Sequence, residues 1–594
     1  MKLSRISLAI LPLLSLCSVQ AAVYNVVEIG EVAQVKATYA SALNDAGAAV
    51  FNGAIRGSVR DPITGAESSI FQYYNFPIRL DAIDFDNETV QGYFTDEQLA
   101  DVSNGIITND ILAILLQRNP AGQPVGNAIS YLLNGTGGAQ NVLLRDTAAE
   151  RGNSEYLYDI NNAGVTVGVA TTTFELQSFT PAPTETVPEP VAKNIWLPQQ
   201  GYRLGVVVQD GVTTALLPPY QEFGGGFSGA NGVSNDGRIA GYGSTGMSEA
   251  LQETLTTGCD GKAEPVALCL YKNTVSSSDA SRYQQRAMLW QLQADGSVTE
   301  PLVLGYLGDK NSGEAYTDEA IAVNYDSYNQ ANAVNTKGIA VGHSMYSDSE
   351  RKVRYQANVD QAAYRQAHAT LFVDGQALPM VDPNEWFVFS TNAALQVGSS
   401  AIDINENDIA VGYASKVLSG SVRRKMFYYD YGSGETTFVD GFFNSSNTMP
   451  NAINDNNQIV GNAEVIVPGT TSRRQHGFVY DITTDSFRDL NSLVSCDAPY
   501  TLVDAKDINN NGEILATAIV EKERKDLLGE VIVDEQGNPQ MEEVAITVKL
   551  QPVANGEPDS CGSDETQYER KGGSAGFTAL LLGAGLLWWR RRKA

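Results

Sequence analysis

A short phrase occurs seven times along this chain of 594 residues, and it constrains the fold more than any other feature. Each copy has an apolar residue, then Asn or Ser, and three positions later Gly, Asp or Asn. An Asn or Ser side chain caps a type I turn, and the later residue tolerates the left-handed conformation that ends such a turn. The copies begin at Ala42, Asp159, Gly232, Ala333, Asp403, Ala452 and Asp507.

The residues after each turn, such as "IAVG" and "QIVG", are short, apolar and partly β-branched, which favours a strand. A small residue closes most copies and would allow close approach of a neighbouring strand. Those residues are Gly168, Gly241, Gly342, Gly412, Gly461 and Ala516. The first copy has Phe51 instead, so we expect an irregular first unit.

A second strand-like phrase follows several copies and ends on an aromatic residue, at Trp290, Phe372, Tyr429 and Tyr480. One compact unit therefore holds about four strands in about 50 residues, which is the size of a propeller blade. We predict an all-β, seven-bladed β-propeller over residues 22–555. Strand-like segments beginning at Val23 and Val544 should share the closing blade, which removes an open sheet edge.

Two insertions interrupt the repeats. The range 94–135 begins with helical periodicity, and Thr95 and Gln98 can form a capping box, so we expect a small helical insertion there. Residues 180–190 are rich in proline and predict a long loop or linker.

The first 21 residues are typical of a secretory signal peptide. Basic residues precede a short apolar run, and cleavage is expected between Ala21 and Ala22. The alternative is a lipoprotein signal ending at Cys17, but Leu16 is large for the position before the modified cysteine.

Export places the remaining cysteines in an oxidising compartment. Cys259, Cys269, Cys496 and Cys561 allow three connectivities. Nearness in sequence favours Cys259–Cys269, with Cys496–Cys561 as the second pair.

The C-terminal end predicts a temporary membrane anchor. An acidic linker over 556–573 leads to a tail over 574–594, in which a short apolar run precedes a basic cluster, Arg590 to Lys593. Such a cluster stays on the cytoplasmic side of a membrane. The run is short for a stable span and contains glycines, which suits cutting by an intramembrane protease. An ordinary single-span anchor is the alternative.

These features resemble known families. Gly572, Gly573 and Ser574, followed by the apolar run and the arginines, resemble the GlyGly-CTERM sorting tail of Gram-negative bacteria. That resemblance implies removal by a rhombosortase-type intramembrane protease, passage through type II secretion machinery, and a final position at the cell surface or outside the cell. The repeats resemble the HAF repeat of extracellular bacterial proteins. The whole layout is similar to the domain-of-unknown-function family 3466, which implies no established activity.

Composition excludes several functions. A net charge of −29 disfavours nucleic acid as a partner. The only histidines are His343, His368 and His476, so a His-based triad or a multi-His zinc site is not expected. Asp507, Asn509 and Asn511 match the start of a calcium loop, but Ala518 stands where the bidentate acid belongs. We therefore assign no cofactor, no metal and no catalytic residue.

One column of side chains could bind a ligand. Four positions before each strand-ending aromatic stand Arg286, His368, Lys425 and His476, and two positions further back stand Arg423 and Arg474. Equivalent positions in a propeller lie at similar radius and height, so these groups predict an arc that binds an acidic polysaccharide or another anion. If the histidines charge, binding tightens toward low pH. The alternative is that they pair with the abundant carboxylates.

We accordingly expect a secreted or surface-displayed binding or scaffold module, whose partner is an acidic polysaccharide or another surface protein. Two rivals remain open: a carboxylate-dependent extracellular hydrolase or lyase, and a structural protein of the cell surface or matrix.

Overall fold

The fold was obtained as a computed structural model. It describes residues 23–32, 35–54, 56–60, 67–71, 83, 85–118, 128–134, 140–142, 155–172, 174–183, 185–198, 203–262, 264–274, 283–308, 328–347, 366–383, 385, 398–418, 420–466 and 472–558.

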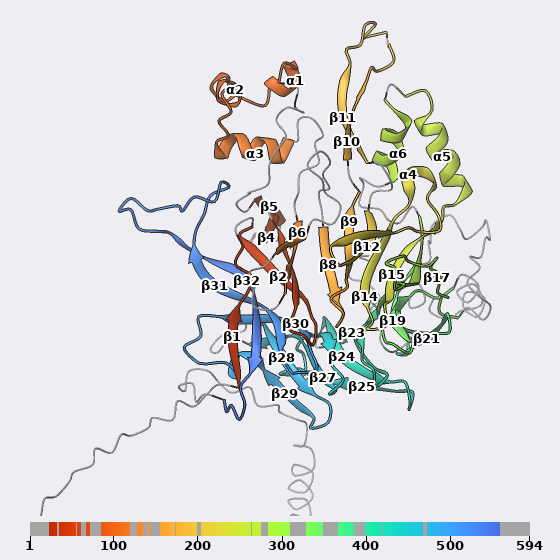
Figure 1. The fold of residues 1–594 in the computed structure, drawn as a ribbon, viewed down its shortest axis with the longest axis vertical. Coiled ribbons are helices and arrows are strands. Elements are labelled where there is room, and N and C mark those ends of the chain that lie inside the picture. Colours follow the sequence, from red (N-terminus) through yellow and green to blue (C-terminus); the bar gives the residue numbers. More distant parts are fainter. Residues whose placement is uncertain are drawn as a thin grey trace, which may run out of the picture.

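The body of the molecule consists of seven four-stranded antiparallel sheets, and each copy of the repeated phrase forms the first turn of one sheet (Figure 1). The first strands are β2 (Ala37–Leu43), β8 (Glu155–Ile160), β14 (Ser228–Val233), β18 (Asn329–Val334), β22 (Ser399–Ile404), β26 (Thr448–Ile453) and β30 (Thr501–Ile508). The second strands are β3 (Ala49–Ala54), β9 (Thr166–Thr171), β15 (Arg238–Gly246), β19 (Ala340–Ser344), β23 (Ile409–Leu418), β27 (Gln458–Ile466) and β31 (Ile514–Glu523).

The outer half of each sheet is equally regular. The third strands are β6 (Ala128–Leu133), β12 (Arg203–Gln209), β16 (Gln284–Gln291), β20 (His368–Val373), β24 (Ser421–Asp430), β28 (Arg473–Asp481) and β32 (Met541–Pro552). The fourth strands are β7 (Gln140–Val142), β13 (Val212–Leu216), β17 (Leu302–Val303), β21 (Gln376–Pro379), β25 (Glu435–Val439), β29 (Ser486–Asp489) and β1 (Tyr24–Glu28).

The sheets are the blades of a propeller. Each first strand contacts the first strands of both neighbouring sheets, and the cycle closes when β30 meets β2. The first strands are therefore innermost, around a common axis, and the seven-bladed propeller expected from the repeats is confirmed.

The last blade is closed by the N-terminal strand. β1 pairs antiparallel with β32, with Tyr24 opposite Pro552 and Glu28 opposite Val548. The first and the last strand of the propeller thus share blade 7, as expected, and their pairing closes the ring of blades.

The repeated turns have the predicted geometry. Gly338 has φ +82° and Gly512 has φ +76°, while Asp408 and Asn457 take φ +63° and +61° at the equivalent position. The first blade is as regular as the others, contrary to expectation, because Phe51 is fully buried and stacks on Tyr131 with ring centres 5.3 Å apart.

The hydrophobic core lies between neighbouring blades. Val411 and Met426 of blade 5, for example, pack with Ile459 and Phe478 of blade 6 in one buried cluster. Most blade faces are buried against other blades, and blade 1 also packs against Leu112 and Leu116 of α3, so a single unit cannot bury its faces alone.

The two faces of the propeller differ. Connections between first and second strands are the short repeated turns, and we call their side the turn face. Connections between second and third strands emerge on the opposite side, the insertion face. Blade 1 has the hairpin β4–β5 (Arg56–Arg60, Glu67–Phe71) and helices α1 (Glu88–Gln91), α2 (Asp96–Ser103) and α3 (Asn109–Arg118) in this connection.

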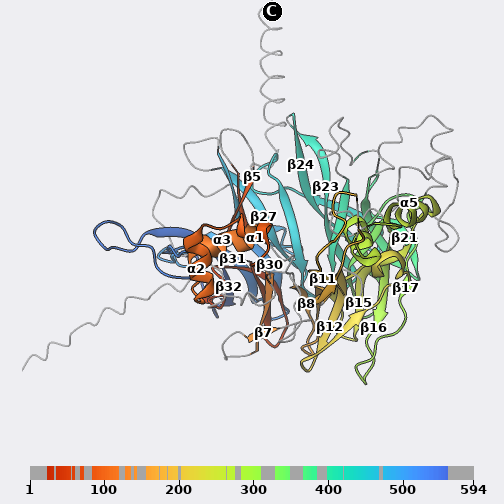
Figure 2. The same cartoon turned by 90° about the horizontal axis from the view of Figure 1, so that it is seen from above.

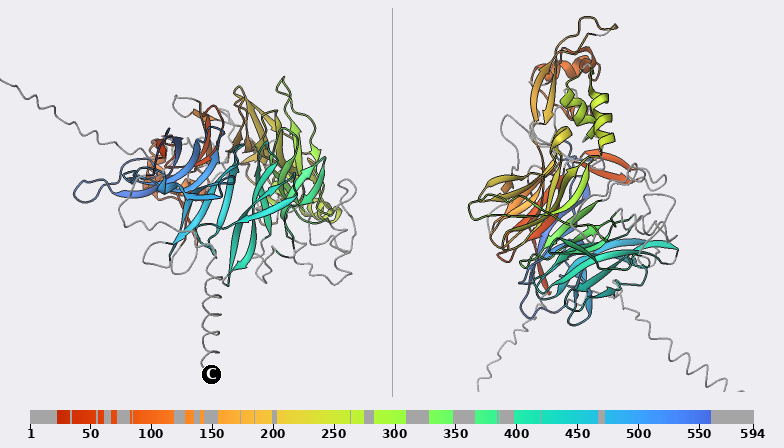
Figure 3. Two further views of the ribbon diagram at one scale, coloured as in Figure 1. Left: turned by 90° about the horizontal axis from the view of Figure 1, so that it is seen from below. Right: turned by 90° about the vertical axis from the view of Figure 1, so that its right-hand side faces the viewer.

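Blades 2 and 3 carry further insertions in the same connection. They are the hairpin β10–β11 (Phe174–Phe179, Lys193–Pro198) and helices α5 (Glu249–Cys259) and α6 (Val266–Thr274). The short α4 (Glu222–Gly225) precedes β14 on the same side. Figure 1 and the right panel of Figure 3 show these insertions grouped at one end of the molecule, and Figure 2 shows that the extension between β31 and β32 projects separately.

The insertions agree in part with the sequence analysis. The capping box at Thr95 and Gln98 is present at the start of α2. Strand β6 falls inside the range given to the helical insertion, so the helices end earlier than expected, at Arg118. Residues 180–190 belong to the tip of the hairpin β10–β11, whose strands the sequence analysis missed.

The predicted signal peptide, the cleavage residues Ala21 and Ala22, and the tail with Gly572, Gly573 and Ser574 lie outside the described residues. Among the residues that are described, no helix is long and apolar enough to cross a membrane.

Candidate functional site

The turn face is held by a ring of asparagine side chains. Six of the seven turns donate a side-chain amide N–H to the backbone carbonyl of the next turn around the ring. The donor–acceptor pairs are Asn44–Asn161, Asn161–Ser234, Asn335–Asn405, Asn405–Asn454, Asn454–Asn509 and Asn509–Asn44, at 3.0 Å to 3.3 Å. The same amides' oxygens cap their own turns, so one side chain fixes both the turn and the blade junction.

Ser234 occupies the seventh position, and a serine has no amide to reach the next blade. Arg238 of the same hairpin bridges this junction instead, with its guanidinium 2.6 Å from the carbonyl oxygen of Thr336. The ring is therefore complete, and this face is occupied by structural hydrogen bonds.

A second set of bonds links the first strands halfway along the axis. Each first strand has a bulge at this level, such as that between Leu157 and Asp159. Four junctions use a hydroxyl or amide that donates to a carbonyl of the next blade, and three use a carboxylate that accepts from a backbone N–H of the next blade. The pairs are Ser41–Leu157, Asn231–Ala331, Asn332–Ala401 and Asn451–Ala505, then Asp159–Val233, Asp403–Ile453 and Asp507–Leu43, all between 2.6 Å and 2.9 Å.

The three axial carboxylates have perturbed acidity. Burial raises the pKa of Asp403 to about 7 and that of Asp507 to about 8. The other two carboxylates of the set raise the pKa of Asp507 further, and burial also raises the pKa of Asp159. A raised carboxyl pKa is typical of catalytic acids but also of structural burial.

The geometry favours the structural role. Both oxygens of Asp507 accept backbone N–H groups, from Ile508 at 2.8 Å and from Leu43 at 2.6 Å. Asn509 likewise uses its side-chain oxygen to accept the N–H groups of Asn511 and Glu513. The oxygens that a calcium loop would offer are thus engaged by the protein, and the described part of the chain contains no metal-binding cluster of acids, histidines and cysteines.

The predicted column of binding residues lies on the third strands of blades 3 to 6, two strands away from the axis. Arg286 is 3% exposed, donates to the carbonyl of Leu304 and lies 4.2 Å over the ring of Tyr306. His368 is wholly buried, with its ring 6.0 Å from that of Tyr346. Both therefore lie within the blades.

The other two members of this column are paired. Lys425 is 4% exposed and contacts Asp440 at 2.9 Å and the carbonyl of Asn444 at 2.7 Å. His476 lies 2.7 Å from a carboxylate oxygen of Asp489. The remaining histidine, His343, contacts the Ser400 hydroxyl at 3.2 Å, and burial lowers its pKa to about 4.

Arg423 and Arg474 lie elsewhere, at the insertion-face ends of the third strands of blades 5 and 6. Arg423 lies 3.6 Å from Glu464 of blade 6, and Arg473 forms a hydrogen-bonded ion pair with the same carboxylate. Burial raises the pKa of Glu464, but the N–H of Asn447 and the Arg473 guanidinium outweigh it and lower the pKa overall. This cluster joins the two blades.

Two arginines next to this cluster face solvent. Arg424 lies over the ring of Tyr413 at 5.2 Å, and Arg474 is exposed beside Arg473. Neither forms an ion pair with any residue that the structure describes. We call Arg423, Arg424, Arg473 and Arg474 the basic patch.

Arg423 and Arg474 were predicted from the sequence, and Arg424 and Arg473 were not. The signal was the arginine pairs in "RRK" and "RRQ", which overlap at the equivalent positions Arg423 and Arg474 but are shifted by one residue in neighbouring units.

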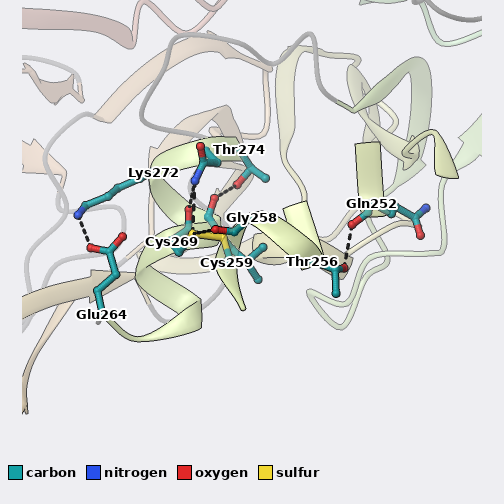
Figure 4. Close-up of a disulfide and its surroundings, with 10 residues drawn as sticks. Gln252, Thr256, Gly258, Cys259, Glu264, Cys269, Lys272 and Thr274 are labelled. Carbon is teal, nitrogen blue, oxygen red and sulfur yellow. Dashed lines mark hydrogen bonds and ion pairs between the residues drawn. A yellow bond between two sulfur atoms is a disulfide. The ribbon is translucent and has the colours of Figure 1, made fainter. Parts of the chain in front are cut away.

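A disulfide fixes the helical insertion of blade 3. Cys259 at the end of α5 is bonded to Cys269 on α6, which confirms that predicted pair (Figure 4). Lys272 and Glu264 form an ion pair alongside at 2.5 Å. Cys496 is also disulfide-bonded, and its predicted partner Cys561 lies outside the described residues.

A cavity of about 630 Å³ lies beside blade 7, between the segment after β1 and the extension of β31 and β32. Two of the lysines that line it are paired with acids, Lys36 with Glu542 at 2.8 Å and Lys522 with Glu28 at 2.7 Å.

The protein is a seven-bladed β-propeller whose turn face is linked by hydrogen bonds between neighbouring turns and whose opposite face carries the insertions. The chain belongs to the family described as "Protein of unknown function (DUF3466)", whose model matches residues 1–592. No curated protein matches it.

Two solved structures align with part of this chain. The β-propeller domain of the Trilobed protease from Pyrococcus furiosus aligns at 9% identity and a TM-score of 0.26, over 66% of this chain and 97% of that one. The Pyrococcus horikoshii acylaminoacyl peptidase aligns at 9% identity and a TM-score of 0.26, over 66% of this chain and 52% of that one. Similarity at this level carries no argument about function.

Proposed function

We propose that the protein is an exported binding module that holds an anionic polymer, an acidic polysaccharide, on its insertion face at the basic patch. The observation that carries this proposal is the exposure of Arg424 and Arg474 on neighbouring blades of a chain whose net charge is −29. In so acidic a chain, arginines without an acidic partner provide a local site that attracts anions.

The surroundings of the two arginines suit a carboxylated or sulfated polymer. Arginine offers planar, paired N–H donors that match such groups. The Arg423–Glu464–Arg473 cluster joins the two blades, and Arg424 and Arg474 lie on the opposite faces of the same strands, on either side of it. Because arginine stays charged, binding through this patch should weaken with salt and depend little on pH.

Binding of polygalacturonate by the purified domain tests this proposal, with dextran as the neutral comparison. Combined replacement Arg424→Ala and Arg474→Ala should weaken polygalacturonate binding at least about ten-fold, as expected for loss of two exposed charge-assisted contacts. Arg488→Ala on β29 is the matched control, since it removes an exposed arginine from the outer strand of the same blade. Equal affinity of the double variant and the wild type would overturn the proposal.

The route to the cell surface is part of the same proposal. The predicted signal peptide, the resemblance of the tail to a sorting signal and the disulfide between Cys259 and Cys269 all support export. Its partners in transit would be a rhombosortase-type intramembrane protease and the secretion machinery, and its destination the cell surface or the medium. A purely structural role in the surface layer or matrix is the alternative that loss of ligand binding would favour.

A carboxylate-dependent hydrolase or lyase is the second candidate, and one observation favours it. Asp403 and Asp507 have raised pKa values, as a general acid requires. Their oxygens already accept two backbone N–H groups each, which supports a structural role. Shortening of polygalacturonate during the binding measurement would favour the enzyme.

A further inference from the structure

Tyrosine side chains are exposed along the innermost strands. Tyr39 on β2 is 41% exposed, Tyr158 on β8 is 38% exposed, and Tyr328, which directly precedes β18, is 40% exposed. Tyr158 is the extra residue of the bulge between Leu157 and Asp159 on β8, at the level where the first strands bond to one another around the axis. Water therefore reaches the axis beside these rings.

Two further tyrosines support this surface. The rings of Tyr156 and Tyr158 stack with centres 6.2 Å apart and planes 10° apart. Tyr242 reaches from the second strand of blade 3 across Gly229 of the first strand. A side chain at position 229 would meet the Tyr242 ring at 2.5 Å, so the glycine is what allows the ring to lie there.

Charged groups border these rings on two sides. Arg203 lies close enough to Tyr158 and Tyr242 to favour ionisation of both phenols, although burial outweighs it and raises both pKa values. The carboxyls of Asp159, Asp403 and Asp507 are buried, and burial raises the pKa of each, which favours their neutral form. The basic patch lies elsewhere, at the insertion-face ends of the third strands of blades 5 and 6.

We propose that the insertion-face half of the axis is a second binding site, which takes an uncharged hexose unit against Tyr39, Tyr156, Tyr158 and Tyr242. Tyrosine combines an apolar ring face with a polar hydroxyl. The C–H face of a pyranose ring stacks on such a face, and the sugar hydroxyls bond to phenol and amide groups around it. The parallel pair Tyr156 and Tyr158 offers the flat surface that this stacking requires.

Binding of neutral hexaoses of glucose with different linkages tests the site by saturation-transfer NMR, with maltohexaose, cellohexaose and laminarihexaose as probes. At least one should receive saturation from the protein. Tyr158→Ala should weaken that binding about ten-fold, the usual scale for loss of an aromatic contact, and Tyr158→Phe should retain it within about two-fold, because the ring remains.

Tyr431→Ala is the matched control, because Tyr431 is 36% exposed in the hairpin between β24 and β25, away from the axis. The test also separates this site from the basic patch: Tyr158→Ala should leave polygalacturonate binding unchanged, and Arg424→Ala with Arg474→Ala should leave hexaose binding unchanged. The proposal is overturned if no hexaose binds, or if Tyr158→Ala and Tyr431→Ala have the same effect.

Discussion

The side-chain amide of Asn509 donates a hydrogen bond to the carbonyl oxygen of Asn44, 3.0 Å away and 465 residues earlier in the chain. The contact joins the last turn of the ring to the first. Because its counterparts repeat at five of the other six junctions, one residue type serves both as a local turn cap and as a link between blades.

Removing one asparagine from this ring should destabilise the propeller. Asn405 accepts the N–H groups of Asn407 and Ile409 and donates to the carbonyl of Asn454. Asn405→Ala leaves the buried carbonyl of Asn454 and the partly buried N–H groups of Asn407 and Ile409 without this partner, and we expect a loss of about 2–4 kcal/mol in the free energy of unfolding. Urea unfolding checks this. Asn407→Ala, at an exposed side chain that donates to the Asp455 carbonyl and the Asn457 side chain, should cost less than about 1 kcal/mol because water can replace both bonds; equal losses would contradict the role of the ring.

The left-handed turn position requires glycine or a residue that tolerates it. At Gly338, with φ +82°, a change to Val should cost about 1–3 kcal/mol because a β-branched residue is strained there. Gly338→Asn should cost clearly less, since Asp408 and Asn457 already occupy equivalent positions. The melting temperatures of the two variants measure this difference. Equal melting temperatures for Gly338→Val and Gly338→Asn would show that the backbone conformation does not constrain this position.

Stability should fall as the pH rises through the neutral range. Asp403 and Asp507 have folded-state pKa values of about 7 and about 8, above the ordinary value of 3.8. The folded state therefore holds these protons more tightly, and the stabilisation is fully present below pH 3.8 and lost as pH rises through 7 and 8. Urea unfolding at several pH values between about 5 and 9 measures the slope.

Asp507→Asn separates this effect from the general repulsion among the many acidic groups. The variant carries no titrating group at that position, so its stability should decline less steeply with pH than that of the wild type. An unchanged slope would mean that Asp507 titrates near its ordinary value.

Some of this architecture was predictable from sequence because its causes are local. In each copy, the Asn or Ser and the Gly, Asp or Asn three positions later indicate a turn within six residues. Seven such turns with strand-like neighbours indicate seven blades. What each Asn amide contacts in the next blade was not predictable, since the acceptor is a backbone carbonyl that no side chain identifies. The same holds for the hairpin β10–β11, whose proline-rich tip is a loop signal that conceals two strands.

The partners of the candidate binding residues were likewise not predictable from the sequence. Lys425 and His476 were placed correctly in one column, but their partners Asp440 and Asp489 come from the fourth strands and the loops after them, which contain no repeated phrase. The exposed tyrosines of the axis were missed because exposure depends on the position of a strand in the ring, and the local sequence does not encode that position.

Processing of the chain ends is open to a direct check. If the tail is a sorting signal, surface or secreted protein should end near Gly572–Ser574 and lack Trp588 and Trp589. Intact-mass analysis of protein recovered from the medium and the cell surface determines where the chain ends. Recovery of the tryptophan pair in that material would contradict the proposed removal of the anchor.

The most direct test of the account is a screen of the purified, folded domain against a panel of acidic and neutral polysaccharides, with chain length of each polymer monitored in parallel. The account predicts capture of at least one acidic polymer, weakened by salt and by Arg424→Ala with Arg474→Ala, and no shortening of that polymer. Absence of any capture, or capture that survives loss of both arginines, would contradict the central claim that the insertion face of this propeller is an anion-binding surface.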